Sequence, residues 1–270
     1  LKQYFLKHVA YLILGIVIVG LIMDPFIFSG RYQGLIWNPN MLSSFTSMAF
    51  AVLFLSKGPR NSFTIFSLIL LFVVSLSTGS RDVIAGFIIL FFFKYGFSKI
   101  NLIYALLALV MHLSLTNFQL ETSVNRFASE SLFDDRILQY MYAYETILEK
   151  PLYGYGLDKY AYIDPDVVAY DHQRYHIISA HNGYLAILTQ YGLIIGLLVI
   201  GIIFSKVFRL YIKVDKKDPE LQSYLYIVCY IPIASMYETF ITGINEFQTI
   251  LFWFSLAFLS FSVFKKEYEA

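Results

Sequence analysis

Residues 183–204 read GYLAILTQYGLIIGLLVIGIIF, an apolar run without a charged residue. A helix of this length crosses the roughly 30 Å of hydrocarbon in a bilayer. The whole chain of 270 residues has 58% hydrophobic and 14% charged residues, with a mean hydropathy of +0.62. Soluble domains carry about 25% charged residues. The composition therefore indicates a membrane protein and excludes the secreted, disordered, collagen-like and nucleic-acid-binding classes.

Apolar runs of similar character recur along the chain. They predict an all-α polytopic membrane protein with about eight transmembrane helices and one large, partly helical extracytoplasmic loop. Five helices would occupy residues 1–116, the loop residues 117–182, and three helices with a short cytoplasmic tail residues 183–270. The predicted helices are His8–Met23, Met41–Ser56, Ser62–Thr78, Val83–Tyr95, Asn101–Thr116, Gly183–Phe204, Leu221–Tyr237 and Phe247–Phe264.

The basic residues alternate between the two sides of the predicted membrane. Short loops on one side carry most of the lysines, which predicts that both termini are cytoplasmic. The net charge of +1 indicates no polyanionic partner, but arginine predominates on the outer side. Because guanidinium binds phosphate and carboxylate in a bidentate way, this predicts an outer anion site; pairing with outer acidic residues is the alternative. The outer arginines are Arg31, Arg81, Arg126, Arg136 and Arg174.

The loop Asn117–Asn182 is too long to be a simple connection. Within it, Arg136–Lys150 has apolar residues at helical spacing, with Asp134 and Asp135 before it as caps and Pro151 after it. We predict an amphipathic helix that lies on the outer membrane surface.

Four motifs fall on the predicted outer side, and together they resemble the O-antigen ligase and polymerase family. The resemblance runs from about Gly30 to Phe264, and the His-Asn-Gly-Tyr-Leu segment is its most specific part. Members of this family usually have some ten to twelve helices, so the resemblance implies that further helices precede this chain. The motifs are GRYQGLIWNPN (30–40), STGSRD (77–82), DDRILQYMYAYETILEKPLYGYGLDKY (134–160) and SAHNGYLAILTQYGLIIGLL (179–198).

The resemblance implies a metal-independent membrane glycosyltransferase that acts on the outer face of the cytoplasmic membrane and needs no cofactor. The implied partners are a polyprenyl-diphosphate-linked glycan donor, a glycan or lipid-linked acceptor, and membrane lipid, with no nucleic acid. A transporter or flippase of a lipid-linked glycan is the alternative. Transport usually calls for ionisable residues or broken helices at the bilayer midplane, whereas the predicted helices have almost no charge in their centres and Glu238 is near an outer end.

His181 precedes the predicted helix that begins near Asn182 or Gly183. The positive end of a helix favours neutral imidazole, and neutral imidazole accepts a proton from a hydroxyl near pH 7. We therefore consider His181 a candidate catalytic base, an assignment that the family resemblance supports. The alternative is that it caps the helix or anchors it among lipid headgroups.

Arg31 and Arg136 match the two outer arginines that are thought to hold the donor diphosphate in the family. Arg31 precedes a turn at which Asn38 can cap a helix that has Pro39 at its first position. A topological or ion-pairing role is the alternative for both arginines. Arg81 also matches a family pattern, although the adjacent Asp82 offers it an ion-pair partner.

Several polar and aromatic residues are candidates for support of the site or contact with glycan. The tyrosines of the outer loop suit carbohydrate stacking, but interfacial belts are tyrosine-rich as well. The candidates are Asn38, Asn40, Asn182, Tyr155 and Tyr184.

Two metal-site patterns are weaker, and we predict no metal site. Asp164-Pro165-Asp166 resembles the carboxylate pair of glycosyltransferases that use nucleotide-sugars, but those donors are cytoplasmic and this pair is outside. His172, His176 and His181 lack the spacing of a zinc set.

Overall fold

A computed structural model describes most of the chain, and its regular elements in the described part are α-helices and short 3₁₀ helices. The all-helical prediction is thereby confirmed for these residues. The chain folds into two compact units, residues 1–130 with 215–230 and residues 131–214 with 231–270. The described residues are 4–57, 60–80, 82–96, 99, 103, 134–159, 163–168, 180–243 and 246–268.

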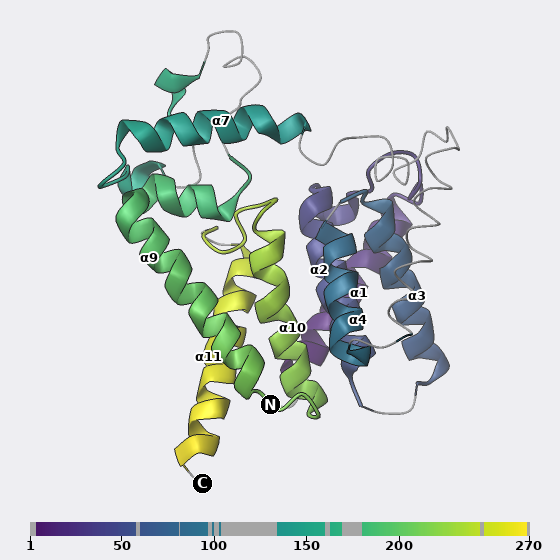
Figure 1. The fold of residues 1–270 in the computed structure, drawn as a ribbon. Helices are drawn as coiled ribbons and strands as arrows, with labels where there is room; N and C mark the ends of the chain where they lie inside the picture. The colour runs from purple at the N-terminus through teal and green to yellow at the C-terminus, as the bar shows by residue number, and fades with distance from the viewer. Residues whose placement is uncertain are drawn as a thin grey trace. The chain divides into compact units, whose positions relative to one another are not determined.

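The first unit is built around α2 (Pro39–Leu55), most of whose residues are buried. It packs against α1 (Phe5–Met23), α3 (Ser62–Ser77) and α4 (Asp82–Tyr95), as Figure 1 shows. α2 is buried although it carries hydroxyl side chains, because those of Ser44 and Thr46 donate to carbonyl oxygens of the same helix. α1 and α3 each leave one face exposed.

α2 begins as its sequence predicts. The Asn38 side chain accepts hydrogen bonds from the N–H groups of Asn40 and Met41, and Pro39 occupies the first helical position. Both features satisfy the constraints of a helix N-terminus, where backbone N–H groups have no partner in the helix. The turn that carries Arg31 therefore leads into a well-defined helix start.

Aromatic rings hold α2, α3 and α4 together. The Phe50 ring meets the Phe87 ring edge-on at a centroid distance of 5.2 Å, and the Phe72 and Phe87 rings lie 5.1 Å apart. An edge-to-face pair such as Phe50 and Phe87 stabilises a core by about 0.5–1.5 kcal/mol beyond its burial. α10 (Pro219–Ala234) contributes residues 219–230 to this unit.

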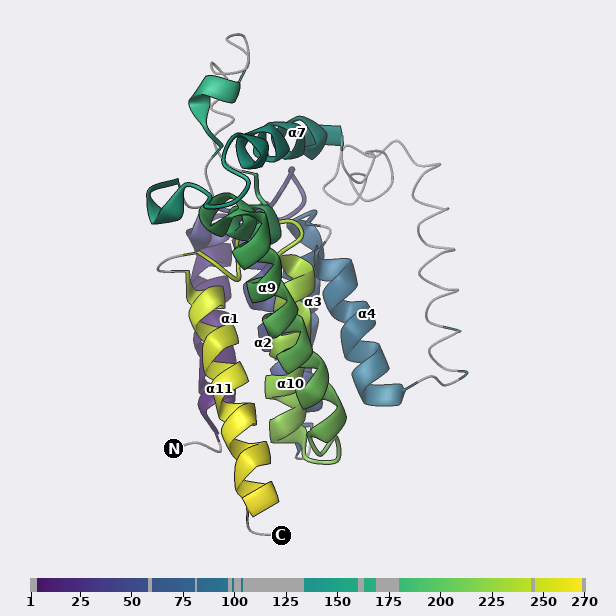
Figure 2. The same cartoon turned by 60° about the vertical axis from the view of Figure 1, so that its left-hand side comes forward.

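The second unit contains helices that run in two directions, as Figures 1 and 2 show. α7 (Asp134–Glu149) lies across the long axis of α11 (Phe247–Tyr268), and α9 (Gly183–Lys213) changes direction along its length. The turns between α7 and α9 include η3 (Gly156–Lys159) and η4 (Pro165–Val167).

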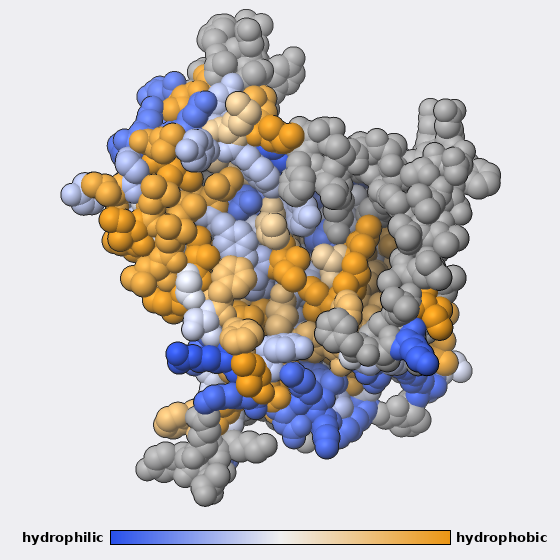
Figure 3. Space-filling model, viewed as in Figure 1, coloured by the Kyte–Doolittle hydropathy of each residue, from blue (hydrophilic) through white to orange (hydrophobic). Residues whose placement is uncertain are grey.

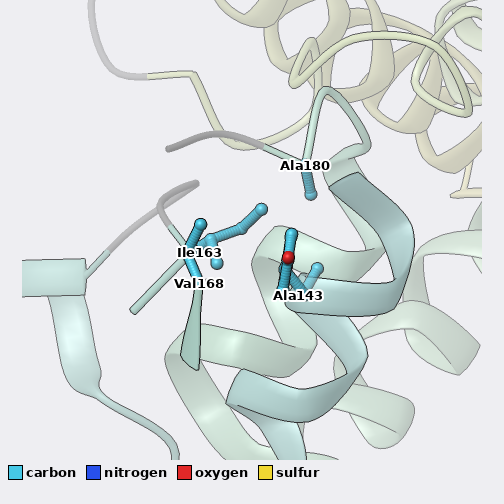
Figure 4. Close-up of a cluster of buried hydrophobic side chains, with 5 residues drawn as sticks. Ala143, Ile163, Val168 and Ala180 are labelled. Carbon is cyan, nitrogen blue, oxygen red and sulfur yellow. The ribbon is translucent and has the colours of Figure 1, made fainter. Parts of the chain in front are cut away.

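α7 confirms the predicted helix at Arg136–Lys150, although it starts at Asp134, so the two aspartates are its first residues rather than caps before it. One face of α7 joins a small apolar cluster that includes Ala143, Ile163, Val168 and Ala180 (Figure 4). This packing ties α7 to the chain just before α9.

α9 folds sharply at Gly192, whose backbone (φ 72°, ψ 176°) is not helical. Residues 183–191 form a short helix that folds back over the longer helix of residues 193–213 (Figure 1). The Tyr184 and Phe204 rings stack across this fold at a centroid distance of 5.7 Å. Only glycine adopts such a backbone conformation without strain.

The predicted continuous helix Gly183–Phe204 is therefore wrong: it is interrupted at Gly192, and its longer part runs on to Lys213. Within residues 183–204, neither side of the fold carries a charged residue, so the absence of charge alone does not reveal the break, although residues 193–204 are more apolar than residues 183–191, which include Thr189 and Gln190. The break depends instead on a turn distant in sequence, since Leu193 N–H donates to the Pro151 carbonyl at 2.7 Å.

The other predicted helices in the described part begin and end within about four residues of their predicted limits. The predicted helix Asn101–Thr116 lies outside the described residues. Three helices in the described part are long and apolar enough to cross a membrane: Phe5–Met23, Gly183–Lys213 and Phe247–Lys265.

We expect Gly192→Ala to lower the melting temperature of the detergent-solubilised protein. The added Cβ would lie 2.5 Å from the Leu152 carbonyl oxygen, and a non-glycine residue at this φ adds strain of about 1–3 kcal/mol. Gly201→Ala in the same helix is the matched control, because no atom lies within 4 Å of its added Cβ. Equal melting temperatures for the two variants would contradict this account of the fold.

Candidate functional site

His181 lies immediately before the N-cap of α9. Its φ of 44° falls in the left-handed region that residues other than glycine rarely adopt. Next to it, the Asn182 side chain accepts hydrogen bonds from the N–H groups of Tyr184 (2.9 Å) and Leu185 (3.2 Å). α9 therefore begins at Gly183 as predicted, and His181 stands at its positive end.

Glu238 bridges His181 and Arg136. Its Oε2 atom lies 3.0 Å from His181 Nδ1, and its Oε1 atom lies 3.5 Å from Arg136 Nη2. The Glu238 side chain is 11% exposed, whereas the His181 side chain is 42% exposed. If His181 donates its Nδ1 proton to this carboxylate, the proton-accepting lone pair of the imidazole is on Nε2.

Arg136 reaches this cluster from the first turn of α7. Its Nη1 atom donates to the carbonyl oxygens of Tyr237 and His181, the latter at 3.3 Å. These bonds, together with the Glu238 ion pair, hold the histidine backbone and the carboxylate in place. The fold thus places Arg136 in contact with His181, although the two residues are 45 positions apart in the chain.

The turn 235–238, which follows α10, connects α7 with the start of α9 through its carbonyl groups. Backbone carbonyls outside regular structure need donors, and here the donors come from α7 and from the start of α9. Gly183 N–H donates to the Ser235 carbonyl (2.8 Å) and to the Glu238 carbonyl (3.1 Å). Asn182 Nδ2 and Tyr140 OH both donate to the Met236 carbonyl, at 3.3 Å and 2.8 Å.

The sequence analysis missed Glu238 as a site residue. It placed this acid near an outer helix end and used it only to weigh transport. The usable signal is a carboxylate that directly follows an apolar run, because a charge at that place needs a partner. Which partner it finds depends on how α7 and α9 pack.

Arg31 belongs to the first unit. Its Nε atom donates to the Thr78 carbonyl at 3.1 Å, and its Nη2 atom donates to Asn40 Oδ1. Ser80 also donates to Asn40 Oδ1, at 2.9 Å. Asn40 therefore links the arginine to the end of α3, and Asn38 holds the start of the same helix as Asn40.

A buried carboxylate lies in the same unit. Asp82 is 3% exposed and accepts hydrogen bonds from Ser43 Oγ at 2.9 Å and from Tyr230 OH at 2.8 Å. These bonds join α2, α4 and α10. Arg81 lies outside the described residues, so its predicted pairing with Asp82 stays a prediction.

Tyr155 and Tyr184 each have structural contacts. Tyr155 OH donates to Glu149 at 2.8 Å. Burial is the largest cause, and this hydrogen bond the second, of a raised pKa of the Tyr155 hydroxyl. Tyr184 OH donates to the Pro232 carbonyl. Their predicted contacts with glycan stay predictions.

Only some residues of the two predicted metal-site patterns lie in the described part of the chain. Asp164 accepts a hydrogen bond from Asp166 N–H at 3.1 Å and so closes the turn that starts η4. Among the described residues, no three His, Cys, Asp or Glu side chains gather as a metal site. Arg126, Arg174, His172 and His176 lie outside the described residues.

Comparison with known proteins identifies the relationship of the chain. The family model of the O-antigen ligases matches residues 65–214, more than half of the chain. The match includes Arg136 and His181 and ends before Glu238. It is shorter than the resemblance inferred from the motifs, which extends from Gly30 to Phe264. No curated protein and no solved structure matches the chain.

Glu246 is a second carboxylate near Glu238. Thr239 Oγ1 donates to its Oε1 atom at 3.3 Å, and its buried Oε2 atom has no hydrogen-bond partner within the described part of the chain. Burial, and to a lesser degree the charge of Glu238, raise the pKa of Glu246 above the ordinary 4.5. Ionised Glu246 therefore destabilises the fold.

We expect Glu246→Gln to raise the melting temperature at pH 8 and to have a smaller effect at pH 4. Because the pKa of Glu246 is raised in the folded state, that state holds the carboxyl proton more tightly than the unfolded state does. Stability therefore declines as pH rises from the ordinary pKa of 4.5 through the raised pKa of the folded state. Glutamine does not ionise and removes that decline. Glu145→Gln, at an exposed position of α7, is the control. A Glu246→Gln effect that is the same at both pH values would rule out this explanation.

Proposed function

This chain belongs to the O-antigen ligase family, and from that premise we propose that it transfers or polymerises a glycan from a polyprenyl-diphosphate-linked oligosaccharide. The proposed reaction takes place at the outer face of the cytoplasmic membrane, with both chain termini in the cytoplasm. The distribution of lysine and arginine along the chain supports this orientation. The acceptor is a second glycan or a lipid-linked saccharide.

The arrangement of Arg136, Glu238 and His181 carries the proposal. A histidine hydrogen-bonded to a buried carboxylate through Nδ1, with a partly exposed ring, has the features of a general base. In this role His181 is the catalytic residue and Glu238 is a positioning residue that acts through it. Arg136 balances the Glu238 charge.

The proposed step is an in-line displacement at the anomeric carbon. The acceptor hydroxyl oxygen forms the new bond to this carbon while His181 Nε2 takes the hydroxyl proton. The bond between the carbon and the diphosphate oxygen breaks, and polyprenyl diphosphate leaves with the bonding electrons. The configuration inverts. Diphosphate is a good leaving group, so the step as proposed requires neither a general acid nor a metal.

Positive charge on the departing diphosphate lowers the barrier most in a partly dehydrated site. We assign this role to Arg31 and Arg136, with Arg81 as a further candidate. A guanidinium has five N–H donors, and the contacts of Arg136 described above use three of them. Its other two N–H groups suit a phosphate oxygen. Asn40 orients Arg31 in the same way that the turn 235–238 orients Arg136.

The remaining candidates are given supporting roles. Asn38 caps α2, which follows the segment with Arg31, and Asn182 caps α9, which follows His181. Tyr155 and Tyr184 are proposed to border the glycan. The transporter alternative is not favoured, because the family is one of ligases.

We expect His181→Asn to reduce glycan transfer by about 10²–10⁴-fold, because it removes the base. Asparagine tolerates the left-handed backbone, so this change separates chemistry from strain better than alanine does. The measurement is glycan lengthening or transfer by the purified protein supplied with a lipid-diphosphate oligosaccharide. His8→Asn, at an exposed histidine of α1, is the control. Normal glycan yield and length from His181→Asn would refute the assignment of the base.

We expect Glu238→Gln to lower kcat by about 10²–10⁴-fold with little change in KM for the donor, because an amide can hold the imidazole in the wrong tautomer. Glu145→Gln again serves as the control. A raised KM at unchanged kcat would instead assign Glu238 to donor binding.

A further inference from the structure

The turn 151–157, which follows α7 and includes the first two residues of η3, exposes large apolar side chains. Leu152 is 53% exposed, Tyr153 is 84% exposed and Leu157 is 59% exposed. Beside them, the Lys150 ammonium lies 4.2 Å from the centre of the Tyr155 ring. Leucine, tyrosine and lysine in one short segment are typical of the boundary between lipid headgroups and acyl chains.

Two glycines hold this turn against the break in α9. A Cβ on Gly154 would lie 2.5 Å from the Gln190 carbonyl oxygen, and one on Gly192 would lie 2.5 Å from the Leu152 carbonyl oxygen. Each glycine thus lets the backbone of the other segment approach. The turn is therefore part of the fold of α9 rather than a loose connection.

This close contact between the turn and the break in α9 also sets the height of the turn relative to the membrane. Leu193 N–H donates to the Pro151 carbonyl at 2.7 Å, which places Leu152 and Tyr153 beside the first residue of the longer α9 helix. At 1.5 Å per residue, residues 193–213 extend roughly 31 Å, close to the hydrocarbon thickness of a bilayer, with Lys206, Arg209 and Lys213 in the last turns, where long basic side chains reach toward the headgroups. The turn therefore lies where that helix enters the membrane.

The exposed apolar surface continues from the turn onto α9. Figure 3 shows a hydrophobic band along this helix that reaches the corner formed by the turn. The residues on the α9 part of the band are each more than half exposed within the described part of the chain, as expected for a surface that faces lipid. They are Ile194, Ile195, Leu197, Leu198 and Ile202.

We propose that the turn 151–157 is a membrane anchor that inserts Leu152 and Tyr153 into the headgroup and upper acyl region of the leaflet at the start of residues 193–213. Under the proposed topology this is the outer leaflet. The anchor fixes the short helix of residues 183–191, and with it His181, at one height above the membrane. The inference rests on the membrane placement of α9 and is independent of the proposed chemistry.

Bilayer lipid is the occupant that the surface favours. A protein partner would need a patch bounded by polar residues, whereas this patch is continuous with the lipid-facing side of a membrane-spanning helix. The Lys150 ammonium beside the patch suits lipid phosphate.

Tryptophan fluorescence in vesicles of phosphatidylcholine and phosphatidylglycerol tests the proposal. The full chain carries Trp37→Phe and Trp253→Phe, plus one new tryptophan at Tyr153→Trp. Leu198→Trp, on the exposed face of α9, is the control for lipid contact, and Glu145→Trp, on the exposed side of α7, is the control for water contact. Quenching is measured with iodide on both sides of the membrane and with lipids brominated near the glycerol or near the chain end.

We expect lipid brominated near the glycerol to quench Tyr153→Trp at least about 2-fold more than lipid brominated near the chain end. Iodide should quench it much less than Glu145→Trp. Iodide quenching equal to that of Glu145→Trp would overturn the anchor. Protection from iodide without quenching by brominated lipid would overturn it as well, because it would mean that protein covers the turn.

Discussion

The second unit depends on one constraint, the need of the carbonyl groups in the turn 235–238 for donors. Arg136 and Tyr140 of α7 satisfy some of them, and Asn182 and Gly183 satisfy the others. Three segments far apart in the sequence are thereby held at one point. Because Glu238 ends this turn, its carboxylate is carried to His181 by the same set of bonds.

The break at Gly192 determines where His181 lies relative to the longer part of α9. A continuous helix would place His181 directly above a membrane-crossing segment, whereas the folded α9 carries it on a short helix that lies across the longer one. The positive end of that short helix faces the site. Because α9 is broken, its longer part can cross the bilayer while its short part, which carries the site, packs against α7.

Local signals in the sequence located most of the described helices. Asn38 with Pro39 caps its helix as predicted, because capping involves only neighbouring residues, and the predicted start of α9 near Asn182 or Gly183 is confirmed. Sequence reasoning, here mainly the family resemblance, singled out His181 and Arg136, which the fold brings together. It missed Glu238 and the fold at Gly192, since both depend on contacts with residues more than 35 positions away.

The sequence by itself determined that this is a membrane protein of the O-antigen ligase family whose described part is helical, because hydropathy, capping residues and short motifs are properties of local segments. Only the tertiary structure decided which carboxylate contacts His181, where α9 breaks and which turn lies beside that break. The physical reason is that hydrogen-bond partners and close backbone approaches arise between segments. Their pairing is set by packing, which no single segment encodes.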